Sequence, residues 1–239
     1  MPALAALVLL AIALESVVGF GATVLVLSLG TWILPVTELL PAYIPVNMAL
    51  SASIAWRDRA AVDGALLRRR VLPLAGVGLL AGLALYRYAA RPELQRAFGV
   101  MVVLIGLNEL RKALAPPSVP VVGRARGNAL LLAGGLVHGV FGTGGVLVVA
   151  ALAGDRLDKS RLRATLAVLW LLMNLAMVAN FAAHGALGAV SLRRSALLLP
   201  ATAAGAYVGQ WVHRRVAERP FRVAMALVMT AAGVATALR

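Results

Sequence analysis

Long runs of apolar residues, separated by short polar and basic clusters, dominate the chain. They cover approximately residues 3–34, 39–56, 71–90, 94–115, 128–153, 164–183, 195–213 and 220–238. A helix needs about 20 apolar residues to cross a bilayer, and most of these runs reach that length. The pattern therefore predicts an all-α polytopic membrane protein.

Glycines interrupt one long apolar run in each half of the chain. Residues 19–23 read Gly-Phe-Gly-Ala-Thr, and residues 141–145 read Phe-Gly-Thr-Gly-Gly. Inside a bilayer, the backbone leaves helical geometry only where protein or a water-filled cavity satisfies its freed amides and carbonyls. Paired interruptions in corresponding places of two halves are typical of the binding sites of transporters. This feature predicts a transporter.

The two halves repeat each other. The phenylalanines of the two glycine motifs, Phe20 and Phe141, are 121 positions apart, whereas Asn47 and Asn174 are 127 apart. The second spacing recurs for Pro73 and Pro200, Gly78 and Gly205, and Gly82 and Gly209. We expect a first membrane repeat over residues 1–115, a proline-rich linker over 116–127 and a second membrane repeat over 128–239.

Basic residues indicate how each repeat crosses the membrane. If all apolar runs cross once, Lys and Arg divide 12 to 11 between the two sides; if each glycine-broken run is a hairpin, they divide 17 to 6. A single straight helix over residues 3–34 would also be about 48 Å long, against a hydrocarbon core of about 30 Å. The positive-inside rule favours hairpins. We therefore predict two inverted repeats, each a hairpin plus about three spanning helices, with both termini periplasmic.

Composition agrees with a membrane protein and excludes several other classes. Hydrophobic residues make up 62% of the chain, charged residues 13%, and the mean hydropathy is +0.90. The net charge of +14 lies in clusters between apolar runs, where the membrane accounts for it without nucleic acid. No cysteine, P-loop, paired metal-binding histidines or Gly-x-Ser-x-Gly motif is present. We expect no enzymatic activity, metal or cofactor, and a small anion and the bilayer as partners.

The glycine motifs are the first candidate binding residues. Broken half-helices direct unpaired amides and a positive dipole end at an anion, and threonine hydroxyls add donors. The alternative is that these small residues only allow close helix packing. The candidates are Gly21, Ala22, Thr23, Gly142, Thr143 and Gly144.

Two further pairs of polar residues lie in the apolar runs. Asn47 and Asn174 offer neutral amides that bind an oxygen of an anion, or else they form interhelical hydrogen bonds. Glu15 and His138 precede the glycine motifs without matching in the sequence repeat. Ionisable groups in a membrane are candidates for coupling or gating, with pairing to a basic group or a carbonyl as the alternative.

The order of these motifs resembles the sulfite exporter TauE/SafE family of membrane permeases. The resemblance rests on the duplicated glycine motifs, the repeated glycine spans and the basic loop 57–70, which contains Ala61-Val62-Asp63 where the family tends to show Asn-Val-Asp. Ala22 and Thr23 also replace further glycines of the first motif. The resemblance implies export of sulfite or small organosulfonates across the inner membrane.

Two other functions fit the residues. A channel or cation permease would line its path with half-helix carbonyls instead of amides. A scaffold or assembly subunit without transport activity would bury both glycine motifs in helix packing. The exact substrate, coupling ion, direction of transport and oligomeric state are left open by the sequence.

Overall fold

The structure is a computed structural model of the whole chain. It describes residues 1–18, 21–89, 91–115, 122–153, 155, 157–213, 215 and 218–238. Gly19 and Phe20 of the first glycine motif, and residues 116–121 of the predicted linker, lie outside the described residues. Every regular element within the described residues is helical, which confirms the all-α prediction.

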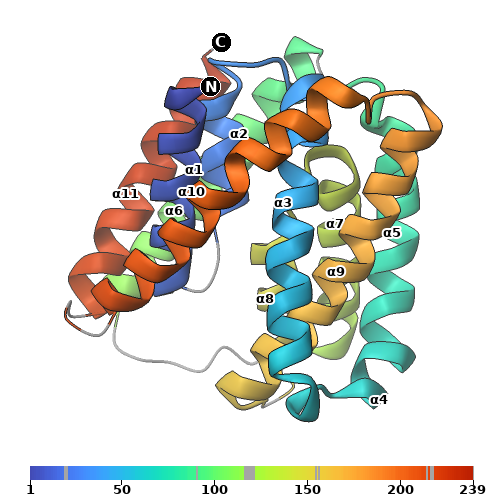
Figure 1. Ribbon diagram of the computed structural model, residues 1–239. Helices are drawn as coiled ribbons and strands as arrows, with labels where there is room; N and C mark the ends of the chain where they lie inside the picture. Colours follow the sequence, from blue (N-terminus) through green and yellow to red (C-terminus); the bar gives the residue numbers. More distant parts are fainter. Residues whose placement is uncertain are drawn as a thin grey trace. The chain divides into compact units, whose positions relative to one another are not determined.

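The main helices follow the apolar runs, and each predicted glycine-broken run is divided into two helices (Figure 1). Their bounds are α1 (Pro2–Val18), α2 (Ala22–Gly30), α3 (Val36–Arg57), α4 (Gly64–Leu66), α5 (Leu72–Tyr86), α6 (Pro92–Leu114), α7 (Arg124–Phe141), α8 (Gly145–Leu152), α9 (Lys159–Ala183), α10 (Ala189–His213) and α11 (Glu218–Ala237). A 3₁₀ turn (Arg59–Ala61) precedes α4, and a π-helical turn (Leu67–Val71) joins α4 to α5. Helix α7 thus begins within the predicted linker.

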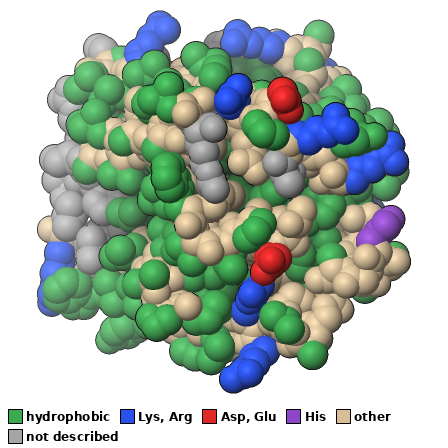
Figure 2. Space-filling model, turned by 90° about the horizontal axis from the view of Figure 1, so that it is seen from above, with side chains coloured by type: hydrophobic (Ala, Val, Ile, Leu, Met, Phe, Trp, Pro, Cys, Tyr) green, Lys and Arg blue, Asp and Glu red, His purple; other side chains and the backbone are tan. Residues whose placement is uncertain are grey.

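Several helices have the length and composition of membrane spans. Within the described residues, Val36–Arg57, Gly64–Tyr86 and Ser160–Ala183 are long and apolar enough to cross a bilayer, and Pro2–Glu15 and Val223–Ala237 are shorter apolar helices. Large apolar side chains also remain exposed on helix surfaces, such as Leu80 of α5, Leu104 of α6 and Leu197 of α10. Figure 2 shows apolar side chains across much of the face that it presents. This distribution suits a protein surrounded by lipid.

Local signals explain where several of these helices begin. Pro92 occupies the first turn of α6, where a missing N–H costs no hydrogen bond. The side chain of Asp158 caps α9 by accepting from Arg161 N at 2.9 Å, and Asp63 caps α4 by accepting from Leu66 N at 2.9 Å. The last aspartate of the basic loop therefore fixes a helix start.

The chain divides into two compact units that do not coincide with its two halves. Unit 1 comprises residues 1–39, 88–118 and 193–239, with α1, α2, α6, α11 and most of α10. Unit 2 comprises residues 40–87 and 119–192, with α5, α7, α8, α9 and most of α3. Each unit therefore combines helices from both sequence repeats.

In unit 2, α5 and α7 pack backbone against backbone. A side chain at Gly78 of α5 would collide with Leu132 O, and one at Gly135 of α7 would collide with Ala75 O. One turn further along, a side chain at either Gly82 or Gly139 would collide with the Cα of the other glycine. These glycines are needed because any larger residue would separate the two helices.

The second glycine-broken segment of the chain, which lies in unit 2, returns to the end of the unit at which it starts. Arg70 Nε donates to Asn128 Oδ1 in the first turns of α7 at 2.9 Å, and Arg70 Nη1 pairs with Asp155 Oδ1 beyond α8 at 2.6 Å. One arginine thus contacts residues near both ends of the segment. Since α7 and α8 together leave and return to the level of Arg70, they form a hairpin (Figure 1).

In unit 1, α6 and α11 run antiparallel and make two sets of glycine contacts. A side chain at Gly106 or Gly233 would meet backbone or side-chain atoms of the opposite helix closer than 3.2 Å. These contacts join Gly106 to Ala226 and Thr230, and Gly233 to Gly99 and Val103. Each α11 residue follows its α6 counterpart by 127 positions, so the second set repeats the first with the two helices exchanged.

Candidate functional site: two helix breaks and a polar chain

The break in unit 2 depends on glycines. Gly142 has φ of +65°, in the left-handed region that favours glycine, and its N–H donates to His138 O at 2.7 Å to close α7. Gly144 precedes α8 and packs on Gly134 of α7, where a side chain would collide with the carbonyl oxygen. The sequence therefore ends one helix and starts another within three residues.

The break in unit 1 is occupied by a carboxylate. Gly21, with φ of +107°, precedes α2 and likewise takes a conformation that favours glycine. Ala22 N, the first amide of α2, donates to Glu15 Oε2 at 2.8 Å. Because a helix N-terminus carries unpaired amides and a partial positive charge, a carboxylate stabilises it.

Glu15 and His138 occupy equivalent positions in the two breaks. Each lies three residues before the end of its first helix, Val18 or Phe141, and six residues before the glycine that precedes the second helix. The equivalent residues are thus 123 positions apart, not 121 as the phenylalanine match suggested. The sequence repeat left Glu15 and His138 unmatched, whereas the helix starts place them at equivalent positions.

Helix packing supports the corrected register. In unit 2, Gly78 of α5 lies against Leu132 O of α7. In unit 1, Gly205 of α10 lies against Leu9 O of α1, and a Cβ added at Gly205 would be 2.5 Å from that oxygen. Leu9 and Leu132 are again 123 positions apart, while Gly78 and Gly205 are 127 apart. This contact therefore recurs with the spacing that pairs Glu15 with His138.

A chain of hydrogen-bonded side chains approaches the break in unit 2. His138 Nε2 lies 3.0 Å from Asn174 Oδ1, and Asn174 Nδ2 donates to Asn47 Oδ1 at 3.0 Å. Asn47 Nδ2 donates in turn to Tyr43 Oη at 3.4 Å. Since Asn174 Oδ1 can only accept, His138 Nε2 must carry a hydrogen, and all three bonds run in the same direction.

His138 is buried and one of its ring nitrogens lacks a partner. The residue is 4% exposed, and Nδ1 has no hydrogen-bond partner in the described part of the chain. The imidazole stacks on the ring of Trp170 with centroids 5.4 Å apart and an angle of 15° between the planes. In a neutral imidazole whose Nε2 holds the hydrogen, Nδ1 is a bare acceptor.

The predicted site residues divide between the two units. Unit 2 contains Asn47, Asn174, His138 and the residues Gly142, Thr143 and Gly144, of which Thr143 is 8% exposed. Unit 1 contains Glu15, Gly21, Ala22 and Thr23. The Ala22 amide already has the Glu15 carboxylate as its acceptor.

Sequence reasoning missed two aromatic members of the site. Tyr43 accepts from Asn47, and Trp170 stacks on His138 and lies 3.7 Å from the position of a Cβ at Gly145. Each aromatic residue precedes its asparagine by one helical turn, and Tyr43 and Trp170 are 127 positions apart. The repeat spacing that matched the asparagines would have found both.

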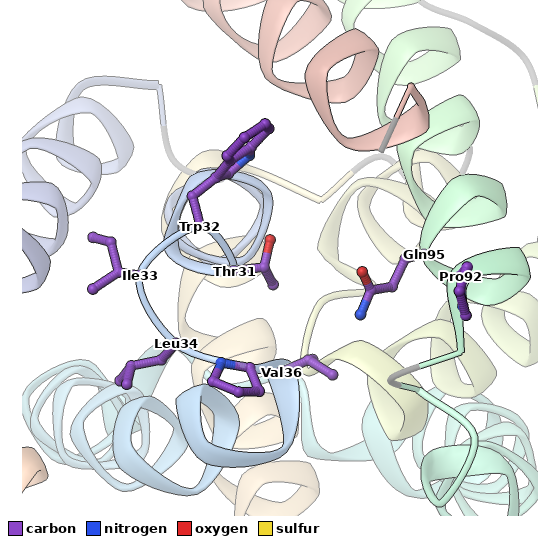
Figure 3. Close-up of a pocket in the computed structure, with 8 residues that line it drawn as sticks. Thr31, Trp32, Ile33, Leu34, Val36, Pro92 and Gln95 are labelled. Carbon is purple, nitrogen blue, oxygen red and sulfur yellow. The ribbon is translucent and has the colours of Figure 1, made fainter.

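A pocket in unit 1 lies away from these residues in the sequence. It has a volume of about 460 Å³ and is formed by the segment between α2 and α3 and by the start of α6 (Figure 3). Thr31 and Gln95 face it from two elements, and Trp32 lies at its edge. None of the predicted site residues lines it.

Comparison with known proteins identifies the family. The model of the sulfite exporter TauE/SafE family matches residues 4–236, which is nearly the whole chain. No curated protein and no solved structure matched the chain. The extent of the family match confirms the resemblance that the motifs indicated. The chain belongs to the sulfite exporter TauE/SafE family, whose members are membrane transporters of sulfur-containing anions and not enzymes.

Proposed function

We propose that the protein is a secondary transporter that exports a small sulfur-containing oxyanion, sulfite or an organosulfonate, across the inner membrane. The observation that carries this proposal is the uncapped start of α8 beside the chain of neutral polar groups formed by His138, Asn174 and Asn47. Such groups bind an anion without burying a formal positive charge. The substrate class comes from the family.

Helix-start amides without an acceptor are available at the second break. Among the described residues, the N–H groups of Gly145 and Val146 have no acceptor, as expected for the first turn of a helix without a side-chain cap. In unit 1 the matching amide, Ala22 N, binds the carboxylate of Glu15. Both features favour an anion over the cation of the alternative channel or permease.

The internal contacts support the proposal of inverted repeats. Helices α6 and α11, which correspond in the two repeats, are antiparallel and exchange the same glycine contacts. Helices α3 and α9 also correspond and run antiparallel, since Asn47 pairs with Asn174 while Asp58, directly after the end of α3, lies 3.8 Å from Arg163 near the start of α9. Within each unit, antiparallel packing of two corresponding helices is the arrangement expected of inverted repeats.

The orientation in the membrane follows from charge. In unit 2, Arg70, the last residue of the basic loop after α3, contacts Asn128 near the start of α7 and Asp155 beyond α8. The positive-inside rule assigns this end to the cytoplasm. Because each hairpin returns to its starting side and three crossings follow, we propose that both termini are periplasmic.

Transport in liposomes tests the proposal. Purified protein is reconstituted with sulfite, methanesulfonate or a divalent metal ion inside, and efflux is followed for wild type, Asn174→Ala, Asn47→Ala and Asn180→Ala. We expect efflux of the sulfur anions, reduced about tenfold or more by loss of Asn174 or Asn47 hydrogen bonds and unchanged by Asn180→Ala. Metal efflux without anion efflux would support the cation permease, and no efflux would support the scaffold.

A further inference from the structure

The two repeats place different side chains at one position of the break. In unit 1, Glu15 extends from α1 to the first amide of α2, so a carboxylate oxygen fills the start of that half-helix. In unit 2, the equivalent residue is His138, which has no carboxylate to offer. The corresponding amide of α8, Gly145 N, has no acceptor among the described residues. The second repeat thus lacks the oxyanion that the first contains.

The acceptor nitrogen of His138 lies closer to its own backbone than a glutamate oxygen would. His138 Nδ1 is two bonds from Cβ, whereas a glutamate oxygen is three bonds from Cβ, so an additional atom is needed to reach an equivalent amide. The ring is also held beside α8, because Trp170 stacks on the imidazole and contacts the Gly145 position. One oxygen of a small anion supplies the missing acceptor.

The unpartnered His138 Nδ1 determines whether the bound anion must carry a proton. The bond from His138 Nε2 to Asn174 leaves Nδ1 as a buried acceptor without a donor. An acceptor nitrogen and an anionic oxygen repel each other unless one proton lies between them. The histidine therefore cannot contact a fully deprotonated anion without taking up a proton.

We propose that the transported oxyanion binds in the second repeat where the Glu15 carboxylate lies in the first, with its oxygens on the first amides of α8 and one proton shared with His138 Nδ1. This inference rests on the proposed function and names the protonation state of its substrate. Hydrogen sulfite brings that proton on its own oxygen. The sulfite dianion and a sulfonate bind only together with a proton from solution, which then resides on Nδ1.

Other ionisable groups around His138 do not supply that proton in the structure. Among the described residues, no charged side chain pairs with His138. The nearest titratable groups through hydrogen bonds or helix packing are the phenols of Tyr43 on α3 and Tyr86 on α5, the second buried without a partner. The charged residues of the packed elements lie at or next to helix ends, namely Glu38, Arg57, Arg87, Arg124, Arg126, Lys159, Arg161 and Arg163.

Calorimetry on purified full-length protein tests the proton. Sulfite is titrated above the pH at which it loses its second proton, in two buffers with different ionisation enthalpies, and the difference in heat gives the protons taken up. We expect one proton per anion in wild type and a tenfold weaker apparent affinity for each further pH unit. Methanesulfonate should take up one proton in the same range. Binding of either anion without proton uptake would overturn the inference and leave the transport function standing.

Variants separate a role in binding from a role in folding. His138→Gln keeps a polar side chain but cannot share a proton, so we expect sulfite to bind about tenfold to hundredfold more weakly and without proton uptake. His184→Gln, at the exposed end of α9, is the matched control and should change neither quantity. His138→Glu should fold, supply its own carboxylate to α8 and abolish anion binding.

The outcomes distinguish this inference from the proposed function. Unchanged affinity and proton uptake in His138→Gln would overturn the inference alone. Anion binding by His138→Glu as tight as that of wild type would do the same. Absence of binding of any sulfur oxyanion by the wild-type protein at every pH would overturn both the inference and the proposed function.

Discussion

Asn174 donates a hydrogen bond from Nδ2 to Oδ1 of Asn47 at 3.0 Å, and the two residues occupy the same position in the two repeats. The bond fixes which way the Asn174 amide faces, and so presents Oδ1 to His138 Nε2. A bond between two asparagines thereby determines which nitrogen of the histidine is bare.

The asparagine pair should therefore be energetically coupled. Asn174→Ala removes the acceptor of the His138 Nε2 bond and the donor of the bond to Asn47 Oδ1, in a site where Asn174 is 1% exposed. We expect it to lower the free energy of unfolding by about 1–3 kcal/mol. A double-mutant cycle with Asn47→Ala should give a coupling energy of about 0.6 kcal/mol, which is typical of polar pairs between membrane helices. Additive effects of the two substitutions would show that the bond contributes nothing.

Replacement by alanine should have different effects on the stability of the protein at the two adjacent glycines of the second break. A Cβ at Gly144 would collide with Gly134 O, whereas one at Gly145 lies 3.7 Å from Trp170, an ordinary contact distance. We expect Gly144→Ala to destabilise the protein by about 1–3 kcal/mol through displacement of α8 from α7. Gly145→Ala should leave the unfolding temperature unchanged. Equal unfolding temperatures for the two variants, measured in detergent, would contradict the close packing of the hairpin.

The hairpin should also depend on the ion pair at its open end. Arg70 Nη1 lies 2.6 and 2.7 Å from the two oxygens of Asp155, and the arginine side chain is only 11% exposed. We expect Asp155→Ala to cost about 3 kcal/mol of unfolding free energy, because it leaves a mostly buried arginine unpaired. The control is Asp58→Ala, whose partner Arg163 is 61% exposed and 3.8 Å away, and which should cost less than about 1 kcal/mol. Similar losses in both variants would contradict this reasoning.

The topology is testable because the chain contains no cysteine. Single cysteines at Ile33, between α2 and α3, and at Ala60, in the basic loop after α3, both replace exposed residues. An impermeant maleimide added to intact cells should label Ile33→Cys and spare Ala60→Cys, since the first position is predicted to be periplasmic. Labelling in the reverse pattern would reverse the predicted orientation, and labelling of both would contradict a crossing by α3.

The sequence was sufficient for features that depend on residue type alone. Glycine at 21 and 142 indicated breaks, and the structure places positive φ angles at both, because only glycine takes that conformation without strain. The equivalence of Glu15 and His138 could not be predicted in this way. Several registers align two glycine-rich motifs, and the correct one depends on where each helix ends. Those ends are set by tertiary contacts such as that of Gly144 with Gly134.

The pairing of helices from different repeats was also beyond the sequence. Gly78 of the first repeat packs against Leu132 of the second, and Gly205 of the second packs against Leu9 of the first. A small residue permits close approach but does not specify the partner, so the glycine spans were compatible with many helix pairs. Sequence spacing did contain the aromatic pair Tyr43 and Trp170, which became significant only once their contacts with Asn47 and His138 were known.

Converting the first break into a copy of the second should create another anion site. Glu15→His removes the carboxylate from Ala22 N and places an imidazole at the position that corresponds to His138. If the carboxylate holds the place of a bound oxyanion, the start of α2 then becomes available, and its amides and dipole favour an anion. We expect the stoichiometry of sulfite binding, measured by calorimetry, to rise from one to two per chain. Glu109→His, which removes the partly exposed partner of Lys112, is the control and should leave the stoichiometry at one. A stoichiometry of one in a folded Glu15→His variant would mean that Glu15 only caps α2, and that the likeness of the two breaks does not extend to anion binding.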